Sequence, residues 1–356
     1  MTAPLASFIR PSIRDLRGYV PGEQPHDRRY IKLNTNENPY PPSPRVIEAV
    51  RRAACEDLRL YPDPSATELR CKAAAVYGLS PAQIIAGNGS DELLAMIVRA
   101  CAGAGDHVVY PMPTYSLYDT LVAIQGAEAV HVPFAEGFAL PLEALAAAAG
   151  RVTFVCNPNA PSGTLTPLAV IEQLARRVAG LLVVDEAYVD FAHDSALPLV
   201  QRYPNVVVLR TFSKSFSLAG MRIGLAFADE GIIAELNKVK DSYNLSRLSL
   251  VAATAALTDY AWMQDNVARI RQTRARLLAG LRALGLEVLP SEANFVLARS
   301  RGRDMGTLQR RLKDGGILVR HFDTPELRDA VRITVGTDAE VETLLETMAP
   351  LLERLD

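Results

Sequence analysis

Cysteine is scarce in this chain of 356 residues, and its placement argues against two kinds of cross-link. The four cysteines are scattered, with no Cys-X-X-Cys pair and no cluster of histidines beside them. Disulfide scaffolds and zinc sites use paired spacings, so we expect neither a disulfide nor a metal site. Buried free thiols, which suit a reducing cytoplasm, are predicted at Cys55, Cys71, Cys101 and Cys156.

Long apolar runs and an excess of positive charge are also missing. The longest apolar stretches, such as residues 142–150, are too short and too rich in alanine to span a bilayer. Arg10, Arg14 and Arg17 are not followed by an uninterrupted apolar segment, so no secretory signal is evident. The formal net charge of −2 provides no basic surface for nucleic acid. We therefore expect a cytoplasmic protein that binds neither membranes nor nucleic acid.

The chain does contain a regular alternation of short β-rich runs and helical segments. Its length exceeds what one hydrophobic core usually serves, which predicts a large and a smaller domain after an N-terminal arm at residues 1–45. The large domain, residues 46–255, is predicted to be α/β, with a mostly parallel seven-stranded sheet between helices. Its seven β-rich runs are residues 83–85, 107–110, 129–133, 152–156, 181–184, 206–209 and 223–226.

A smaller α+β domain is predicted at residues 256–356. It begins with a long helical stretch at residues 262–284, in which Arg and Gln are spaced between apolar positions. Four β-rich runs and two further helical segments follow, at residues 286–289, 293–297, 317–319 and 331–335 and at residues 304–314 and 338–355. The arm is rich in Pro, Arg and Asn and has no periodicity, so we expect it to lie over a surface.

Lys214 is the most informative residue, because it follows the apolar run at residues 206–209 and is surrounded by hydroxyls. A lysine amine can condense with an aldehyde, and partial burial lowers its pKa enough to free the lone pair. Thr211, Ser213 and Arg222 can donate to phosphate oxygens, Arg in a two-pronged fashion. Taken alone, this run fits a cofactor site and an ordinary loop at a strand end equally well.

Other predicted strands also end in polar groups, and ligands of open α/β sheets bind beyond the carboxyl ends of the strands. The sequence GNGSDE at 87–92 precedes an apolar helix, whose first amides suit a phosphate, although Ser90 or Asp91 could be a plain helix cap. PMPTY at 111–115 can place the Tyr115 ring over a planar ligand or in the core. NPNAPSG at 157–163 is a rigid turn with side-chain donors.

Asp185 closes the apolar run at residues 181–184, where a carboxylate is costly unless a cation pairs with it. A protonated pyridine nitrogen is such a cation, and its protonation makes the ring an electron sink. Tyr188 can direct its hydroxyl at the same ligand. Asp185 alone also fits a helix cap, but five strand ends with complementary polar groups favour one common site.

Together these segments resemble the pyridoxal-phosphate aminotransferases of fold type I, and specifically the histidinol-phosphate aminotransferase family. The resemblance covers nearly the full length of the chain. It rests on LNTNENP at 33–39, RLYP at 59–62, GNGSDE at 87–92, PTY at 113–115, DEAY at 185–188, RTFSKSFSLAGMR at 210–222 and RITVG at 332–336. As a set, these motifs specify the cofactor and the fold more strongly than the substrate.

The resemblance implies a role for each matching residue. Lys214 would form the Schiff base with pyridoxal 5'-phosphate and move the proton, Asp185 would pair with the ring nitrogen, and Tyr188 would bond the ring hydroxyl. Tyr115 would stack on the ring, and Tyr61 would reach the phosphate from the partner subunit of a homodimer. The remaining implied contacts are Gly89, Ser90, Asp91, Thr211, Ser213 and Arg222 at the phosphate and Arg332, Arg320, Tyr19 and Asn36 in the substrate pocket.

One position departs from the family pattern. The family turn usually reads Asn-Asn-Pro-Thr-Gly, and the Asn before Pro bonds the ring hydroxyl, but this chain has Ala160 there. A missing donor costs roughly 1 kcal/mol unless a neighbour replaces it. Either Tyr188 bonds the ring hydroxyl alone, or Asn157 or Asn159 reaches in; Asn159 is the predicted cofactor contact. Transamination should survive the change, since the lysine and the electron sink are intact.

The resemblance implies an aminotransferase that moves an amino group between histidinol phosphate and 2-oxoglutarate in histidine biosynthesis, giving imidazole acetol phosphate and glutamate. An aromatic amino-acid aminotransferase or a phosphothreonine decarboxylase on the same scaffold remains an alternative, because sequence does not fix which bond to Cα is broken. A cofactor-sensing transcription regulator would need an added DNA-binding domain, for which the sequence shows no segment before the arm. The expected partners are an amino donor, a keto acceptor and a second copy of the chain.

Overall fold

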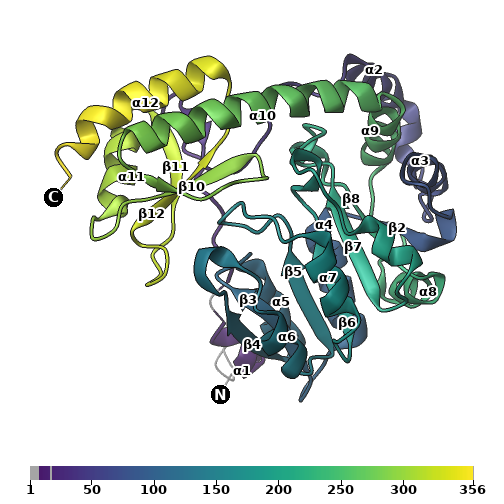
Figure 1. Cartoon of the computed structure of the whole chain (residues 1–356). Helices are drawn as coiled ribbons and strands as arrows, with labels where there is room; N and C mark the ends of the chain where they lie inside the picture. The colour runs from purple at the N-terminus through teal and green to yellow at the C-terminus, as the bar shows by residue number, and fades with distance from the viewer. Residues whose placement is uncertain (1–7, 17, 356) are drawn as a thin grey trace, which may run out of the picture.

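The computed structural model describes residues 8–16 and 18–355. Arg17 and residues 1–7 of the predicted arm lie outside the described residues, as does residue 356. A seven-stranded sheet forms the larger part of the molecule (Figure 1). Its strands, in spatial order, are β2 (Ile84–Gly87), β8 (Gly224–Phe227), β7 (Val206–Thr211), β6 (Leu181–Asp185), β5 (Val152–Cys156), β3 (His107–Met112) and β4 (Glu128–Pro133).

All seven predicted β-rich runs are strands, and the sheet is mostly parallel as predicted. The exception is β8, which runs antiparallel to both of its neighbours, β2 and β7. β5 is buried at every position, and β6 and β7 at nearly every position, because helices cover both faces of the sheet. Continuous runs of Val, Leu and Phe are therefore stable there, where an alternating pattern would bury polar groups.

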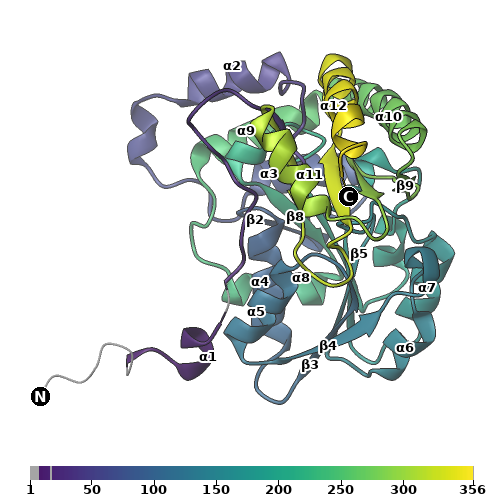
Figure 2. The ribbon, with the colours of Figure 1, turned by 90° about the vertical axis from the view of Figure 1, so that its left-hand side faces the viewer.

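Helices lie on both faces of this sheet. In the view of Figure 2, α4 (Ser90–Cys101), α5 (Leu117–Gln125) and α8 (Glu230–Val239) lie to one side of the strands. The helices α6 (Leu142–Ala147) and α7 (Leu168–Ala175) lie to the other side. Three more helices, α2 (Pro44–Ala53), α3 (Thr67–Tyr77) and α9 (Arg247–Thr258), pack against one another, with α9 in contact with both α2 and α3.

A second sheet of five strands confirms the predicted smaller α+β unit. Its order is β1 (Ile31–Leu33), β11 (Ile317–His321), β12 (Ala330–Thr334), β10 (Phe295–Arg299) and β9 (Glu287–Val288). The strand β1 comes from the N-terminal arm and pairs in parallel with β11. The arm is therefore built into the second sheet at this point, which the sequence did not predict.

The helix α10 (Tyr260–Ala283) connects the two parts of the molecule. It runs along the top of Figure 1 from α9 to the second sheet, and it contacts α9 at one part of its length and β9, β10 and α12 (Asp338–Leu352) at another. The remaining helix of this unit, α11 (Met305–Asp314), packs on β11. The boundaries at residues 45 and 255 stay predictions.

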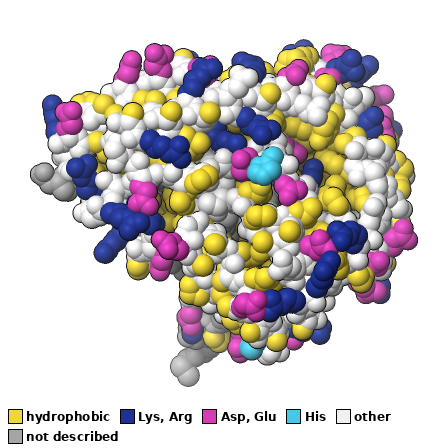
Figure 3. Space-filling view, viewed as in Figure 1, with side chains coloured by type: hydrophobic (Ala, Val, Ile, Leu, Met, Phe, Trp, Pro, Cys, Tyr) yellow, Lys and Arg dark blue, Asp and Glu magenta, His cyan; other side chains and the backbone are white. Residues whose placement is uncertain are grey.

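The surface seen in Figure 3 carries Lys and Arg interspersed with Asp and Glu, as a net charge near zero suggests. Cys156 is buried and Cys101 is half-buried, but Cys55 and Cys71 are exposed. The prediction of burial is thus wrong for these two: Cys55 lies just after α2, Cys71 lies on α3, and both are exposed to solvent. No helix in the described part of the chain is both long enough and apolar enough to cross a bilayer.

Candidate active site

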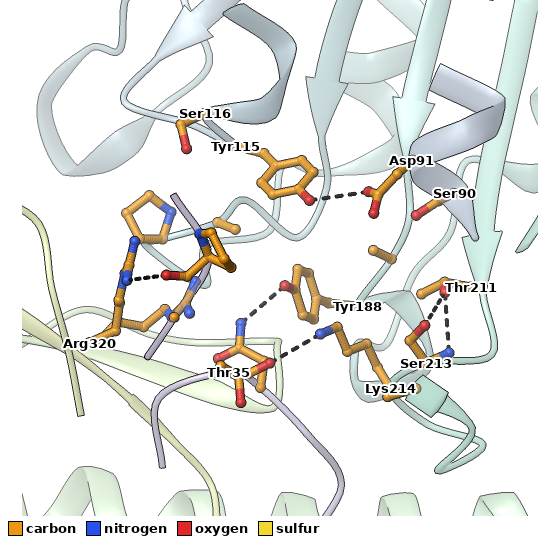
Figure 4. A pocket seen from close by; sticks show the side chains of 18 of the residues that line it. Thr35, Ser90, Asp91, Tyr115, Ser116, Tyr188, Thr211, Ser213, Lys214 and Arg320 are labelled. Carbon is orange, nitrogen blue, oxygen red and sulfur yellow. Dashed lines mark hydrogen bonds between the residues drawn. The ribbon is translucent and has the colours of Figure 1, made fainter. Parts of the chain in front are cut away.

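A pocket of about 240 Å³ lies where the carboxyl ends of β5, β6 and β7 meet the arm and the second sheet. This is the usual ligand position in an open α/β sheet. Figure 4 shows the side chains that converge on it. Thirteen of the sequence-predicted residues line this pocket: Tyr19, Asn36, Ser90, Asp91, Tyr115, Asp185, Tyr188, Thr211, Ser213, Lys214, Arg222, Arg320 and Arg332.

Lys214 follows β7 and projects its amine into the pocket (Figure 4). Its Nζ donates a hydrogen bond to the carbonyl oxygen of Thr35 over 3.3 Å, and lies 5.8 Å from the centre of the Tyr188 ring. Burial lowers the pKa of Lys214 to about 8, and the nearby Arg332 guanidinium acts on this pKa in the same direction. At pH 7 roughly a tenth of this amine is therefore uncharged, far more than for an ordinary lysine, and this form is a nucleophile and a base.

Asp185 ends β6 and is 2% exposed. Its carboxylate accepts hydrogen bonds from the Tyr118 hydroxyl at 2.8 Å and from the Ala187 backbone amide at 3.2 Å. No cationic side chain among the described residues lies within ion-pair distance of it. Burial accordingly raises the pKa of Asp185 to about 6. A buried carboxylate without a protein cation fits a positively charged ligand atom such as a protonated ring nitrogen.

The start of α4 forms an anion cradle with the turn after β7. Gly89 adopts φ +82, a conformation that favours glycine, and a Cβ at this position would lie 2.6 Å from Nη2 of Arg222, so that the guanidinium would have to shift. Arg222 extends one nitrogen to Asp91 Oδ2 at 3.2 Å and another to Ser213 Oγ at 3.4 Å. The Thr211 hydroxyl donates to Ser213 Oγ at 3.0 Å. The helix N-terminus, the hydroxyls and the guanidinium together suit a phosphate.

Two tyrosines frame the space between Lys214 and the cradle. The Tyr115 hydroxyl donates to Asp91 Oδ1 at 3.1 Å, which fixes the ring above the pocket (Figure 4). The Tyr188 hydroxyl accepts from the Asn36 amide at 3.0 Å. Tyr115 and Asp185 line the same pocket, and their predicted contacts with a cofactor ring stay predictions.

Asn36 joins the arm to both sheets. Besides its bond to Tyr188, its backbone amide donates to Thr334 Oγ1 at 3.0 Å, and its carbonyl accepts from Asn294 at 2.9 Å. Its φ of 57 lies in the left-handed region, which Asn tolerates better than most residues. The arm therefore forms one wall of the pocket, and its hydrogen bonds to Thr334 and Asn294 hold it in place.

Two arginines of the second sheet face the pocket from the side of the arm. Arg332 donates to the Asn34 carbonyl at 3.0 Å, but its buried Nε has no hydrogen-bond partner among the described residues. Burial lowers the pKa of Arg332, and no described carboxylate pairs with it. Arg320 donates to the carbonyls of Val20 and Pro21 at 3.0 and 3.2 Å. A cation with a free donor is suited to an anionic substrate group.

Three of the sequence-predicted residues do not line the pocket. Gly89 lies next to the Arg222 guanidinium, and its lack of a side chain leaves room for that group. Asn159 is buried, and its side-chain amide is bonded to Ser162 of its own turn and to Pro113 and Thr114 just after β3. The structure therefore does not bring Asn159 to the pocket, whereas Ala160 does line it. Tyr61 is 77% exposed and stacks on Tyr243 with ring centres 4.3 Å apart.

Sequence reasoning missed Tyr118, which bonds Asp185 directly, and Thr35, whose carbonyl holds the lysine amine. A tyrosine in an amphipathic helix is usually a core residue, so its only signal was its position three residues after Tyr115. A backbone carbonyl gives no sequence signal at all. In the described part of the chain, no group of three or more His, Cys, Asp or Glu side chains is arranged for a metal ion.

Comparison with known proteins agrees with this geometry. Residues 28–348 match the family model for aminotransferase class I and II. Histidinol-phosphate aminotransferase of Citrifermentans bemidjiense is 49% identical over 96% of this chain and 98% of its own length. Histidinol-phosphate aminotransferase 1 of Trichormus variabilis is 44% identical over 98% of this chain and its full length.

Among solved structures, histidinol-phosphate aminotransferase of Sinorhizobium meliloti in complex with pyridoxal-5'-phosphate superimposes with a TM-score of 0.90. The two sequences are 33% identical, and the match covers 98% of each chain. The shared architecture is that of the fold type I aminotransferases, as the sequence predicted. The chain therefore belongs to the class I and II aminotransferases, which are pyridoxal-phosphate-dependent transaminases, and within them to the histidinol-phosphate aminotransferase family.

Proposed function

We propose that this protein binds pyridoxal 5'-phosphate and transfers an amino group from histidinol phosphate to 2-oxoglutarate, giving imidazole acetol phosphate and glutamate in histidine biosynthesis. The observation that carries the proposal is one pocket holding a lysine whose pKa is lowered by burial, a carboxylate without a protein cation, an anion cradle and two arginines. The names of relatives that are 44–49% identical support the choice of substrate.

The cofactor is the first part of the proposal. Bound pyridoxal phosphate supplies an aldehyde that carries the amino group and a ring that accepts the electrons released at Cα. Asp185 would hold the ring nitrogen in its protonated form, because the ionised carboxylate then gains the cation it lacks. Lys214 would take the proton from the substrate Cα and deliver it to the aldehyde-derived carbon of the cofactor, on the other side of the shared nitrogen.

The remaining contacts hold the cofactor in place. Tyr188, oriented by Asn36, would donate its hydroxyl hydrogen to the ring oxygen, and Tyr115 would cover one face of the ring. The side chains for the phosphate would be Ser90, Thr211, Ser213 and Arg222. Ala160 leaves the ring oxygen without the family's usual amide. Neither asparagine of that turn would replace it, because the Asn159 amide bonds Pro113, Thr114 and Ser162 and the Asn157 amide bonds the Thr166 backbone.

Substrate recognition is assigned to the wall made by the arm and the second sheet. Arg332 would bind the carboxylate of glutamate and 2-oxoglutarate, since it lines the pocket and no carboxylate of the described residues pairs with it. Arg320 lies beside it and would bind the phosphate of histidinol phosphate, and Tyr19 would line the same pocket. Two arginines allow one site to accept a dicarboxylate and a phosphate monoester in turn.

A homodimer is proposed as the active form. Tyr61 is exposed and is not part of the hydrophobic core of its own chain. Its ring stacks on that of Tyr243, which is 48% exposed. Large exposed aromatic side chains that form a pair mark an interaction surface. From this surface, Tyr61 would reach the phosphate cradle of the partner subunit.

The test is a set of single half-reactions on the cofactor-loaded protein. Histidinol phosphate, phenylalanine, tyrosine and glutamate are mixed separately with the enzyme, and the loss of its visible absorbance is followed. We expect histidinol phosphate to react at the lowest concentration, with glutamate also active. A fastest reaction with phenylalanine or tyrosine would assign an aromatic amino-acid aminotransferase, and release of carbon dioxide from phosphothreonine would assign a decarboxylase.

A further inference from the structure

We propose that Tyr118 is a positioning residue for Asp185, whose buried hydroxyl keeps the carboxylate charged and oriented toward the ring nitrogen of the cofactor. The inference rests on the proposed pyridoxal-phosphate site. It concerns a residue that does not itself line the pocket, since Tyr118 lies behind Asp185 near the start of α5.

The geometry fixes the Tyr118 hydroxyl on one oxygen of Asp185. Tyr118 is fully buried, and its hydroxyl lies 2.8 Å from Oδ2, while the Ala187 amide lies 3.2 Å from Oδ1. The Tyr118 ring stacks on Phe154 with centres 4.8 Å apart and meets Tyr115 edge-on at 5.6 Å. A ring held on two sides cannot swing away, so each carboxylate oxygen has one fixed donor.

The other groups around Asp185 do not replace this donor. Asp91 on α4 raises the pKa of Asp185, and Cys156 on β5 and the rings of Tyr115 and Tyr188 also face it. Burial is the largest influence and raises the pKa of Asp185 to about 6, and the Tyr118 hydrogen bond opposes this rise more than the Ala187 amide does. Tyr118 remains a neutral donor, because burial raises the pKa of its phenol well above the usual value.

The loss of this hydroxyl has a specific consequence. A charge-assisted hydrogen bond stabilises the ionised carboxylate more than its neutral form. Without it, Asp185 binds a proton more tightly, and a protonated Asp185 offers no charge to a cationic ring nitrogen. The affinity of the site for the cofactor should then fall at a higher pH than in the wild-type protein.

The test measures binding of pyridoxamine 5'-phosphate to cofactor-free protein by equilibrium dialysis, over about pH 5 to 9. This probe has an amine in place of the aldehyde, so its binding does not depend on condensation with Lys214. Wild-type protein is compared with Tyr118→Phe and with the matched control Tyr110→Phe. Tyr110 is equally buried and donates to Asp119 at 2.6 Å, but it makes no hydrogen bond to Asp185.

We expect the acid-side loss of affinity to move upward by about one pH unit or more in Tyr118→Phe, since hydrogen bonds to charged groups are strong enough for such a shift. Tyr110→Phe should follow the wild-type profile. The three dissociation constants should converge at the alkaline end, where Asp185 is charged in every variant. The phosphate of the probe titrates alike in all three and cancels in the comparison.

Two results would overturn the inference in distinguishable ways. If wild-type protein does not bind the probe at any pH, the proposed cofactor site fails, and the role of Tyr118 fails with it. If wild-type protein binds but Tyr118→Phe keeps the profile of Tyr110→Phe, only the role of Tyr118 fails. If Tyr118→Phe does not fold, the double variant Tyr118→Phe, Asp185→Asn is tested instead. It is expected to fold, because it contains no buried carboxylate that lacks the Tyr118 donor. A double variant that also fails to fold contradicts the proposed link between Tyr118 and Asp185.

Discussion

Glu186 and Arg210 form a buried ion pair that joins the strand ending in Asp185 to the strand leading to Lys214. Nη2 of Arg210 lies 3.1 Å from Oε2 of Glu186, and the two side chains are 12% and 0% exposed. Ser195 and the Ala196 amide also donate to Glu186, at 2.9 and 2.5 Å. The pair therefore holds together the two strand ends that supply the catalytic groups.

Glu186→Ala should destabilise the protein strongly, because it leaves Arg210 buried with only Asp190, 3.6 Å away, as a counter-charge. A loss of roughly 3–5 kcal/mol in the free energy of unfolding is expected when one partner of a buried pair is removed. Denaturant unfolding of the cofactor-free protein measures it. The control is Glu143→Ala, which breaks the exposed pair with Arg177 and should leave the transition nearly unchanged. Equal effects of the two changes would contradict this account.

Lys214→Met should stabilise the cofactor-free protein at neutral pH. The folded pKa of Lys214, about 8, lies below its unfolded value, so the unfolded chain binds more protons between these two values. The cost of burying Lys214 is thus present below about pH 8 and disappears as the pH rises toward about 10.4. The gain from Lys214→Met should reach up to roughly 3 kcal/mol at neutral pH and shrink in alkali. Urea unfolding at both pH values checks it; a gain that is independent of pH would contradict the lowered pKa.

Arg332→Met should weaken the use of both dicarboxylates, glutamate and 2-oxoglutarate, because their carboxylate loses a charge-assisted partner. We expect KM for each of them to rise by about tenfold to a hundredfold. Arg320→Met should instead raise KM for histidinol phosphate more than KM for glutamate. Arg301→Met is the control, since Arg301 pairs with Glu287 on the exposed side of the same unit. Steady-state kinetics with each substrate varied decide the assignment, and an interchange of the two effects would reverse the two roles.

Tyr61 and Lys214 of the same chain should belong to different active sites. Lys214→Ala and Tyr61→Phe subunits, each weakly active or inactive alone, are mixed and allowed to exchange. If Tyr61 crosses the interface, one site of the hybrid holds both native residues, and both activity and tight cofactor binding return. No recovery in a hybrid whose formation is verified would place Tyr61 in the site of its own chain.

The strands and the polar groups at their ends were predictable from the sequence, because parallel strands end at one edge of a sheet. Asp185, Lys214 and Ser90 each follow an apolar run directly or within a few residues, so the strand fixes where the side chain lies. The strand β1 was not predictable, because Ile31–Leu33 is short and its partner, β11, lies near the other end of the sequence. Its surroundings of Pro and Asn are typical of a loop.

For other residues the sequence indicated the position along the chain but not the direction in which the side chain points. Asn159 lies at the expected turn, but its amide is used by Thr114 and Ser162, and this choice is made by tertiary contacts. Tyr118 has the pattern of a core aromatic residue, and only tertiary packing, with its ring stacked on Phe154, brings its hydroxyl to Asp185. The exposure of Cys55 and Cys71 could not be predicted from the sequence. Cysteine is usually buried, but this is a statistical preference, and no neighbouring residue in the sequence determines it.

The most direct test of the proposed function is the ratio of kcat/KM for histidinol phosphate to that for phenylalanine and tyrosine, measured with 2-oxoglutarate as the acceptor. Histidinol without its phosphate is included as the matched substrate. We predict the highest kcat/KM for histidinol phosphate and a loss of at least about a hundredfold for histidinol, because the half-buried Arg320 then lacks the anion that it would bind. A higher kcat/KM for phenylalanine or tyrosine, or an equal value for histidinol, would contradict it.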